Sequence, residues 1–344
     1  MSAAALLLRP LLLAARSLSN GFVYMLQLCW LQLQGWGQGY GMGLACLGCS
    51  LNALVYVGLL YMRASWLPRN HPVTIRRRMA SVSMACCLTW LPLHFALPPS
   101  RSWAQAVDRL AAALGLHWHH IQEAVLYPMA HLAVLYACPL MAALWTKGLR
   151  GLCAPPLRWA RRLAGAIWRG RLRDVVSCLA DPFAPHRLWL WRNLLVAPVT
   201  EEWVFRACMA PLLLLAGASM SVVVVVTPLF FGAAHFHHLH DLLLYQGASL
   251  KSAVSMVLVQ YAYTTLFGCY ATWLFLRTGS LVSPVVAHVA CNWMGLPNLT
   301  HMVAVFGRPL TVLLTTASVM SFWWLMQPMT EPALFGGPWR ITRP

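Results

Sequence analysis

The sequence is poor in charge, and poorest in negative charge. Of 344 residues only 10% are charged, 8 are acidic, and two, Lys147 and Lys251, are lysine. Soluble domains have about 25% charged residues, whereas 60% of this chain is hydrophobic. This composition excludes an ordinary soluble domain and predicts a polytopic membrane protein.

Apolar segments long enough to cross a bilayer fill most of the chain. A transmembrane helix needs about 20 mostly apolar residues, and no repeat of the kind that builds solenoids is present. We predict an all-α polytopic membrane protein, a single bundle of about eight transmembrane helices with an intramembrane cavity. The predicted spans are 41–62, 79–98, 121–145, 189–216, 218–234, 252–276, 283–305 and 308–326.

The spans leave no room for a separate soluble domain. We expect one transmembrane domain over residues 41–330, an unassigned N-terminal segment over 1–40 and a C-terminal tail over 331–344. Polar and ionisable side chains enter the apolar segments mainly in the second half of the chain. Chemistry is therefore expected between residues 189 and 305.

The positive charge is concentrated in two connections between spans. The net charge is +17, and basic residues crowd the connections 63–78 and 147–192, while 99–120 contains only Arg101 and Arg109. This alternation places the first and third connections in the cytosol, where they can bind anionic membrane lipids. No nucleic-acid recognition motif accompanies the charge, so a nucleic-acid partner is not expected.

Two adjacent glutamates, Glu201 and Glu202, stand inside an apolar segment. An ionisable group at bilayer depth costs at least about 2.5 kcal/mol and commonly marks function. Glu202 and Arg206 are four residues apart, which predicts a helical ion pair and leaves Glu201 without a helical partner. The alternative is that one acid neutralises Arg206 and the other is solvated at the end of a span.

Histidines form a second polar group, at positions 235, 237, 238 and 240. Zinc binding is one interpretation, but the zinc-protease signature, in which glutamate follows the first histidine, is missing. Glu201 or His288 would have to complete such a site. The thiol of Cys208 is a further alternative, as a nucleophile paired with His235, although a cysteine in apolar surroundings is usually unreactive.

The third polar group is His288 with Asn292, four residues apart on one face of a predicted helix. The helix is predicted to begin near Ser283-Pro284, and a break is predicted at Gly295 and Pro297. Hydrogen bonding between membrane helices is the simpler interpretation of this pair. Together, however, the three groups contain a carboxylate, two imidazoles and an amide, which fit hydrolysis of an amide bond.

The three groups also resemble the motifs of a known family, the type II CAAX prenyl endopeptidases, in the Ras-converting branch of a superfamily of intramembrane glutamate proteases. The resemblance covers most of residues 50–330 and is strongest over 189–296. The N-terminal segment and the stretch 150–192 depart from it. The motifs are Glu201-Glu202-x-x-x-Arg206, Phe231-x-x-x-His235 and His288-x-x-x-Asn292.

The resemblance implies a multi-pass protease of the endoplasmic reticulum membrane, with its active site opening toward the cytosol. Its partners would be prenylated CaaX proteins such as small GTPases, from which it removes the last three residues. The implied catalytic residues are Glu201 and His235, which activate water, and His288 with Asn292, which form the oxyanion site. Glu202 and Arg206 would support them, with no metal and no other cofactor.

Two other functions were weighed against this one. In a transporter or scaffold, Glu201, Glu202 and the histidines would form an ion relay. In a zinc-dependent membrane hydrolase, His235 and its neighbours would bind the metal. The sequence predicts no oligomeric state.

Overall fold

The computed structural model describes residues 41–62, 67, 69–148 and 188–337, with a few positions between 164 and 174. The predicted N-terminal segment 1–40 lies outside these residues, as do most of the stretch 150–187 and part of the tail 331–344. The described regular structure is entirely helical. This confirms the predicted all-α fold.

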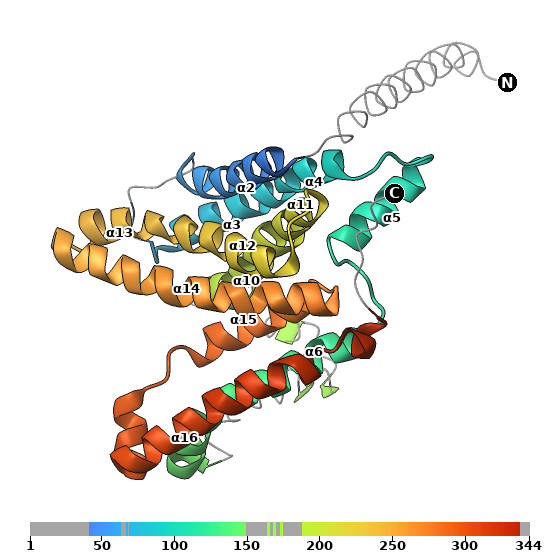
Figure 1. Ribbon diagram of the computed structural model, residues 1–344. Helices are drawn as coiled ribbons and strands as arrows, with labels where there is room; N and C mark the ends of the chain where they lie inside the picture. Colours follow the sequence, from blue (N-terminus) through green and yellow to red (C-terminus); the bar gives the residue numbers. More distant parts are fainter. Residues whose placement is uncertain are drawn as a thin grey trace.

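The helices vary from one turn to more than 30 residues in length (Figure 1). Two π-helical segments, Arg192–Val196 and Trp203–Cys208, and a 3₁₀ turn, His235–His237, lie between α-helices. The α-helices are α2 (Met42–Met62), α3 (Pro72–Thr89), α4 (Leu91–Ala96), α5 (Trp103–Ala113), α6 (Ile121–Leu135), α9 (Leu188–Trp191), α10 (Ala197–Glu202), α11 (Met209–Leu215), α12 (Met220–Ala234), α13 (His238–Tyr245), α14 (Leu250–Thr278), α15 (Val282–Met294) and α16 (Leu299–Met329).

Four helical stretches in the described part of the chain are long and apolar enough to cross a membrane, or five if a pair bent by 77° counts as one span. The polytopic character is therefore confirmed, but the predicted number of about eight spans is not. The four are Met42–Tyr61, Pro72–Ala96, Met220–Tyr245 and Leu299–Met329, and the bent pair is Ile121–Leu135 with Ala137–Gly148.

The predicted spans that do not pass this test are 189–216, 252–276 and 283–305. Each contributes residues to the main cavity of the protein. The first is divided into short segments and α15 has only 13 residues, so neither forms one helix of bilayer length, whereas 252–276 lies within the 29-residue α14. The discrepancy therefore falls on segments that line this cavity.

Backbone geometry explains two of the interruptions. Residues 188–215 form five short α and π segments where one continuous span was predicted. At the predicted break after α15, Gly295 has a φ of 66° and caps the helix, and the Asn298 side chain accepts a hydrogen bond from the His301 backbone at the start of α16. The break at Gly295 and the start of α15 near Ser283-Pro284 are thus confirmed.

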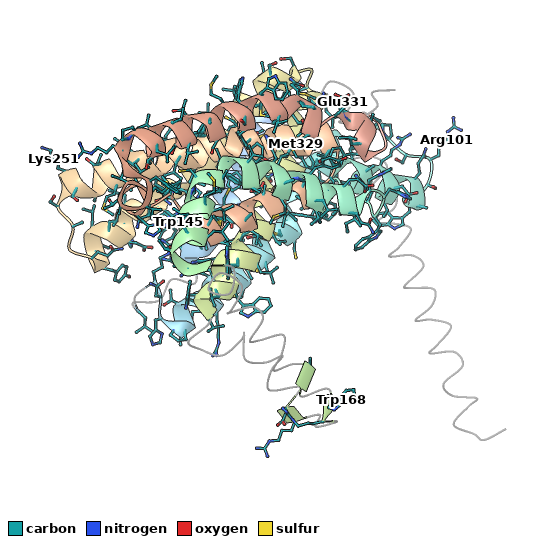
Figure 2. All side chains as sticks on the ribbon, turned by 90° about the horizontal axis from the view of Figure 1, so that it is seen from below. Arg101, Trp145, Trp168, Lys251, Met329 and Glu331 are labelled. Atoms are coloured by element: carbon teal, nitrogen blue, oxygen red, sulfur yellow. The ribbon has the colours of Figure 1, made fainter. Side chains whose placement is uncertain are left out.

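The helices form two groups with α14 and α15 between them. Helices α2 and α3 pack together on one side, while α6 and α16 lie side by side on the other (Figure 1). Lys251, near the start of α14, and Arg101 lie at opposite ends of the molecule, with Glu331 on the side of Arg101 (Figure 2). Arg277, in the last turn of α14, binds Glu331 at 2.9 Å, so α14 runs along the molecule.

The apolar residues are divided between the core and the outer surface. Phe205, Met209 and Leu212, from the interrupted segment, are fully buried in the largest core cluster. Helix α16 instead exposes apolar side chains along its outer face, including Val312, Leu313, Met320 and Trp324. Such a surface suits contact with lipid tails, in keeping with a multi-pass membrane protein.

Candidate active site

Helix α10 positions the adjacent glutamates, and it is flanked by the two π-helical segments. π-helical turns within α-helices frequently occur at functional sites. The two carboxylates have different surroundings: the Glu202 side chain is fully buried, whereas the Glu201 side chain is 17% exposed and lines the main cavity. Neighbours in sequence therefore face different environments.

Glu202 belongs to a closed polar cluster behind the cavity. The buried Arg206 guanidinium donates from Nη1 to Glu202 Oε1 at 3.1 Å, which confirms the ion pair predicted from their spacing. The Arg206 Cζ also lies 4.3 Å from the centre of the Phe231 ring, a cation–π contact. Aromatic packing and the carboxylate thus hold Arg206 in place.

His288 connects the two glutamates. Its Nδ1 lies 2.7 Å from Glu202 Oε1, and because an ionised carboxylate can only accept, Nδ1 carries the hydrogen. Its Nε2 lies 3.7 Å from Glu201 Oε2. The imidazole therefore faces a buried carboxylate with one nitrogen and a cavity carboxylate with the other.

His235 enters the cavity from the turn after α12. Its Nδ1 donates to the Phe231 carbonyl at 2.8 Å, so in the neutral ring Nε2 is left as an acceptor. The Phe231 ring meets the imidazole edge-on, with centres 4.8 Å apart. The sequence prediction paired Glu201 with His235, whereas the structure gives Glu201 an ion-pair contact with His288 and places His235 on the same cavity.

Asn292 lies one turn after His288 on α15. Its side-chain Nδ2 donates to the Asn193 backbone carbonyl at 2.8 Å. An amide NH₂ group has two hydrogens, so one N–H remains for another acceptor. Asn292 also lines the cavity, and Glu201, His235, His288 and Asn292 thus meet at one space.

The cavity has a volume of about 1080 Å³. Small-molecule sites usually enclose about 300–1,000 Å³, so this one can hold a larger ligand. Away from the glutamates its wall is apolar and comes from α6, α14 and α16, through Leu132, Leu135, Leu266, Phe267, Phe322 and Trp323. The cavity therefore joins a polar centre to an apolar space within the membrane-spanning part.

Comparisons with known proteins identify relatives of this chain. The family model for type II CAAX prenyl endopeptidase Rce1-like proteins matches residues 183–294. This range includes the four candidate catalytic residues Glu201, His235, His288 and Asn292. CAAX prenyl protease 2 of Homo sapiens is 35% identical over 308 residues, 87% of this chain and 86% of the human protein. CAAX prenyl protease 2 of Arabidopsis thaliana is 31% identical over 306 residues, 87% of this chain and 93% of that protein.

The chain belongs to the type II CAAX prenyl endopeptidase family. It is therefore a protease, and the resemblance inferred from the three motifs is confirmed. No solved structure matches the chain.

The neighbouring histidines His237 and His238 each form a hydrogen bond of their own, with a partner other than His235. The His237 Nδ1 donates to the Ala234 carbonyl at 2.6 Å, and the His238 Nδ1 accepts from Arg69 Nη1 at 3.1 Å. Across the described residues, no three His, Cys, Asp or Glu side chains are grouped to hold a metal ion. The zinc interpretation therefore has no ligand set in this part of the chain.

The thiol alternative also lacks the necessary geometry. Cys208 is fully buried, with its Sγ 3.9 Å from Thr89 Oγ1. It is absent from the described lining of the cavity that holds His235. A nucleophile must lie within hydrogen-bond reach of its base, so Cys208 is not placed for that role.

Sequence reasoning missed three residues of the cavity wall. Arg69 and Arg192 were read only as members of basic connections, and Asn193 was not considered. Arg192 donates from Nε to Asn193 Oδ1 at 2.9 Å, and the Asn193 carbonyl in turn accepts from Asn292. Arg69, Arg192 and Asn193 lie at the edges of apolar segments, where polar residues can face a cavity. This position was the feature of the sequence that could have predicted their place in the cavity wall.

Proposed function

We propose that this family member removes the last three residues of prenylated CaaX proteins, using a water molecule that Glu201 activates. The observation that carries the proposal is the meeting of Glu201, His235, His288 and Asn292 at one cavity with an apolar extension. The name CAAX prenyl protease 2, shared by the matched relatives, supports the substrate class.

In the first step, water lies between the Glu201 carboxylate and the acceptor Nε2 of His235. Glu201 takes one proton from this water as its oxygen attacks the carbonyl carbon of the scissile amide. The carbonyl π electrons move to oxygen and form a tetrahedral oxyanion. His235 orients the water and does not need to change its protonation.

The oxyanion receives hydrogen bonds from the second N–H of Asn292 and from His288. The Nδ1–H of His288 is held by Glu202, so the imidazolium form of His288 donates to the oxyanion through Nε2. In the second step the C–N bond breaks, and the proton held by Glu201 passes to the leaving nitrogen. The products are a carboxylic acid on the prenylated chain and a free tripeptide, and the proposed reaction uses no metal ion or other cofactor.

Glu202 and Arg206 have a positioning role in this scheme. Glu202 holds the Nδ1–H of His288 at 2.7 Å and is itself held by Arg206. This fixes the imidazole so that Nε2 faces Glu201 and the cavity. Neither residue needs to touch the substrate.

The apolar wall between α6, α14 and α16 is the proposed site of the prenyl chain. Each buried CH₂ of a lipid chain contributes about 0.8 kcal/mol, so a prenyl group would contribute most of the binding energy. We further propose the endoplasmic reticulum membrane as the location, a cytosolic opening of the site, and small GTPases among the substrates. The basic connections would hold the protein against anionic lipid.

The test is release of the tripeptide in liposomes. The purified protein should cleave a farnesylated CaaX peptide and not its unprenylated twin, and Glu201→Ala should abolish cleavage. Failure to cleave, or full activity in Glu201→Ala, would overturn the proposal. Proton flux into the same liposomes without cleavage would instead support an ion relay.

A further inference from the structure

Three arginines line the cavity together with Glu201: Arg69, Arg78 and Arg192. Arg78 is neutralised, because its two terminal nitrogens each lie 3.3 Å from an oxygen of Asp241. Within the described ranges, neither Arg69 nor Arg192 has a carboxylate at ion-pair distance. Two guanidinium charges therefore face the cavity without a counter-ion from this part of the chain.

Neutral partners hold these two guanidinium groups in place. Arg69 donates from Nη1 to His238 at 3.1 Å, while Arg192 donates from both terminal nitrogens to Asn70 Oδ1 at 3.2 Å and from Nε to Asn193. A guanidinium has five N–H donors, and the contacts among the described residues occupy four of those of Arg192 and one of those of Arg69. The fixed, planar donors of Arg69 can match the two oxygens of a carboxylate, and Arg192 can add one further N–H.

Hydrogen bonds link the arginines to the reacting centre. Asn292 donates to the Asn193 carbonyl, and the Asn193 side chain accepts from Arg192. Arg192 Nη1 also lies 3.4 Å from the Arg69 carbonyl. A few hydrogen bonds therefore connect the guanidinium groups of Arg69 and Arg192 to Asn292, the proposed oxyanion donor. The three residues to be released from the substrate reach roughly 10 Å when they are extended.

We propose that Arg69 and Arg192 bind the free α-carboxylate at the C-terminus of the substrate. This inference rests on the proposed function, because the anion is the end of the tripeptide that is released. A carboxylate bound at a fixed distance from Glu201 sets the cleavage point three residues from the chain end. It also explains why two cationic side chains line a cavity that otherwise extends into apolar walls.

The test compares two farnesylated peptides that differ only at the C-terminus, one a free acid and the other an amide. Wild-type protein in liposomes of zwitterionic lipid should cleave the acid with a kcat/KM about 10- to 100-fold higher, because hydrogen bonds to a charged group are lost in the amide. Arg69→Gln and Arg192→Gln should each reduce this acid-to-amide ratio toward one. The ratio is the readout, since damage to Asn292 positioning would slow both peptides equally.

Arg76→Gln and Arg77→Gln are the matched controls, because both arginines are exposed on the neighbouring α3 and lie outside the described cavity lining. They should keep the wild-type ratio. If Arg192→Gln does not fold, Arg192→Lys should keep part of it.

Equal cleavage of acid and amide by the wild type, or an unchanged ratio in both glutamine variants, would overturn the inference and leave the proposed function standing. A preference for the acid only in liposomes with anionic lipid would also overturn it, because the arginines would then serve the lipid headgroup. Absence of tripeptide from either peptide would contradict the proposed function itself.

Discussion

The two faces of the α10 segment differ in what surrounds their charges. Behind the cavity, Glu202 and Arg206 are fully buried and hold His288 through short hydrogen bonds. On the cavity side, Glu201 keeps part of its surface exposed and lines the same cavity as His235 and Asn292. A closed cluster is suited to fixing geometry, whereas an accessible carboxylate can exchange protons with water and substrate.

The different surroundings of Glu201 and Glu202 explain why the helical segment around α10 is interrupted. An uninterrupted α-helix would follow one regular spacing of side chains, while the π segments on either side of α10 alter that spacing locally. The same short stretch therefore supplies a core cluster and a cavity wall. By contrast, α16 spans 31 residues with a single kink, at Gly307 (φ 75°), and exposes apolar side chains on its outer face.

The largest effect is expected from a substitution that breaks the closed cluster of Glu202, Arg206 and His288. Arg206→Met leaves Glu202 buried without its cation, which should lower the free energy of unfolding by about 3–5 kcal/mol. The measurement is unfolding in detergent micelles. Arg101→Met, at an exposed arginine, should change it by less than about 0.5 kcal/mol, and equal effects of the two variants would contradict the account.

On the cavity face, Asn292→Ala removes a proposed oxyanion donor. Its kcat for the farnesylated peptide should fall about 100- to 1,000-fold, with little loss of stability because Asn292 is exposed. Asn298→Ala provides the comparison, since it removes the cap of α16 and should cost stability without a comparable loss of kcat. A full rate in Asn292→Ala would remove this residue from the mechanism.

His235 offers a finer distinction among the histidines. His235→Ala removes the group that orients water and should lower kcat about 100-fold. His240→Ala, at an exposed position outside the described cavity lining, should leave kcat within about twofold. A similar loss in both variants would mean that the histidine cluster acts as a unit and not through His235.

The smallest expected effect concerns the buried thiol. Cys208→Ala should leave kcat within about twofold, because Cys208 lies in the core and away from the cavity. The same liposome assay measures it. Loss of nearly all cleavage in a folded Cys208→Ala protein would revive nucleophilic catalysis by the thiol.

Much of the fold was predictable, since bilayer-length apolar runs, the start of α15 near Pro284 and the break at Gly295 follow from local chemistry. The stretch 189–216 was wrongly predicted as one continuous helix, because the π segments left no signal in the sequence. Four-residue spacing predicted the pair of Glu202 with Arg206. The contact of His288 with Glu202 joins residues 86 positions apart, so spacing could not reveal it.

For the same reason the sequence identified candidate residues but not their arrangement. The roles of Glu201, His235, His288 and Asn292 came from the family resemblance and stay predictions. The arginines were visible only as charge, because their positions at the borders of apolar segments give no periodic pattern that would point them toward a cavity.

The most direct test of the central claim compares Glu201→Gln with Glu202→Gln in one preparation, measuring both tripeptide release and unfolding temperature. Glu201→Gln should lose about 1,000-fold in kcat and keep its unfolding temperature, while Glu202→Gln should unfold at a lower temperature and keep more activity than Glu201→Gln. Equal losses of activity at unchanged stability, or an active Glu201→Gln, would contradict the division between a catalytic and a positioning glutamate.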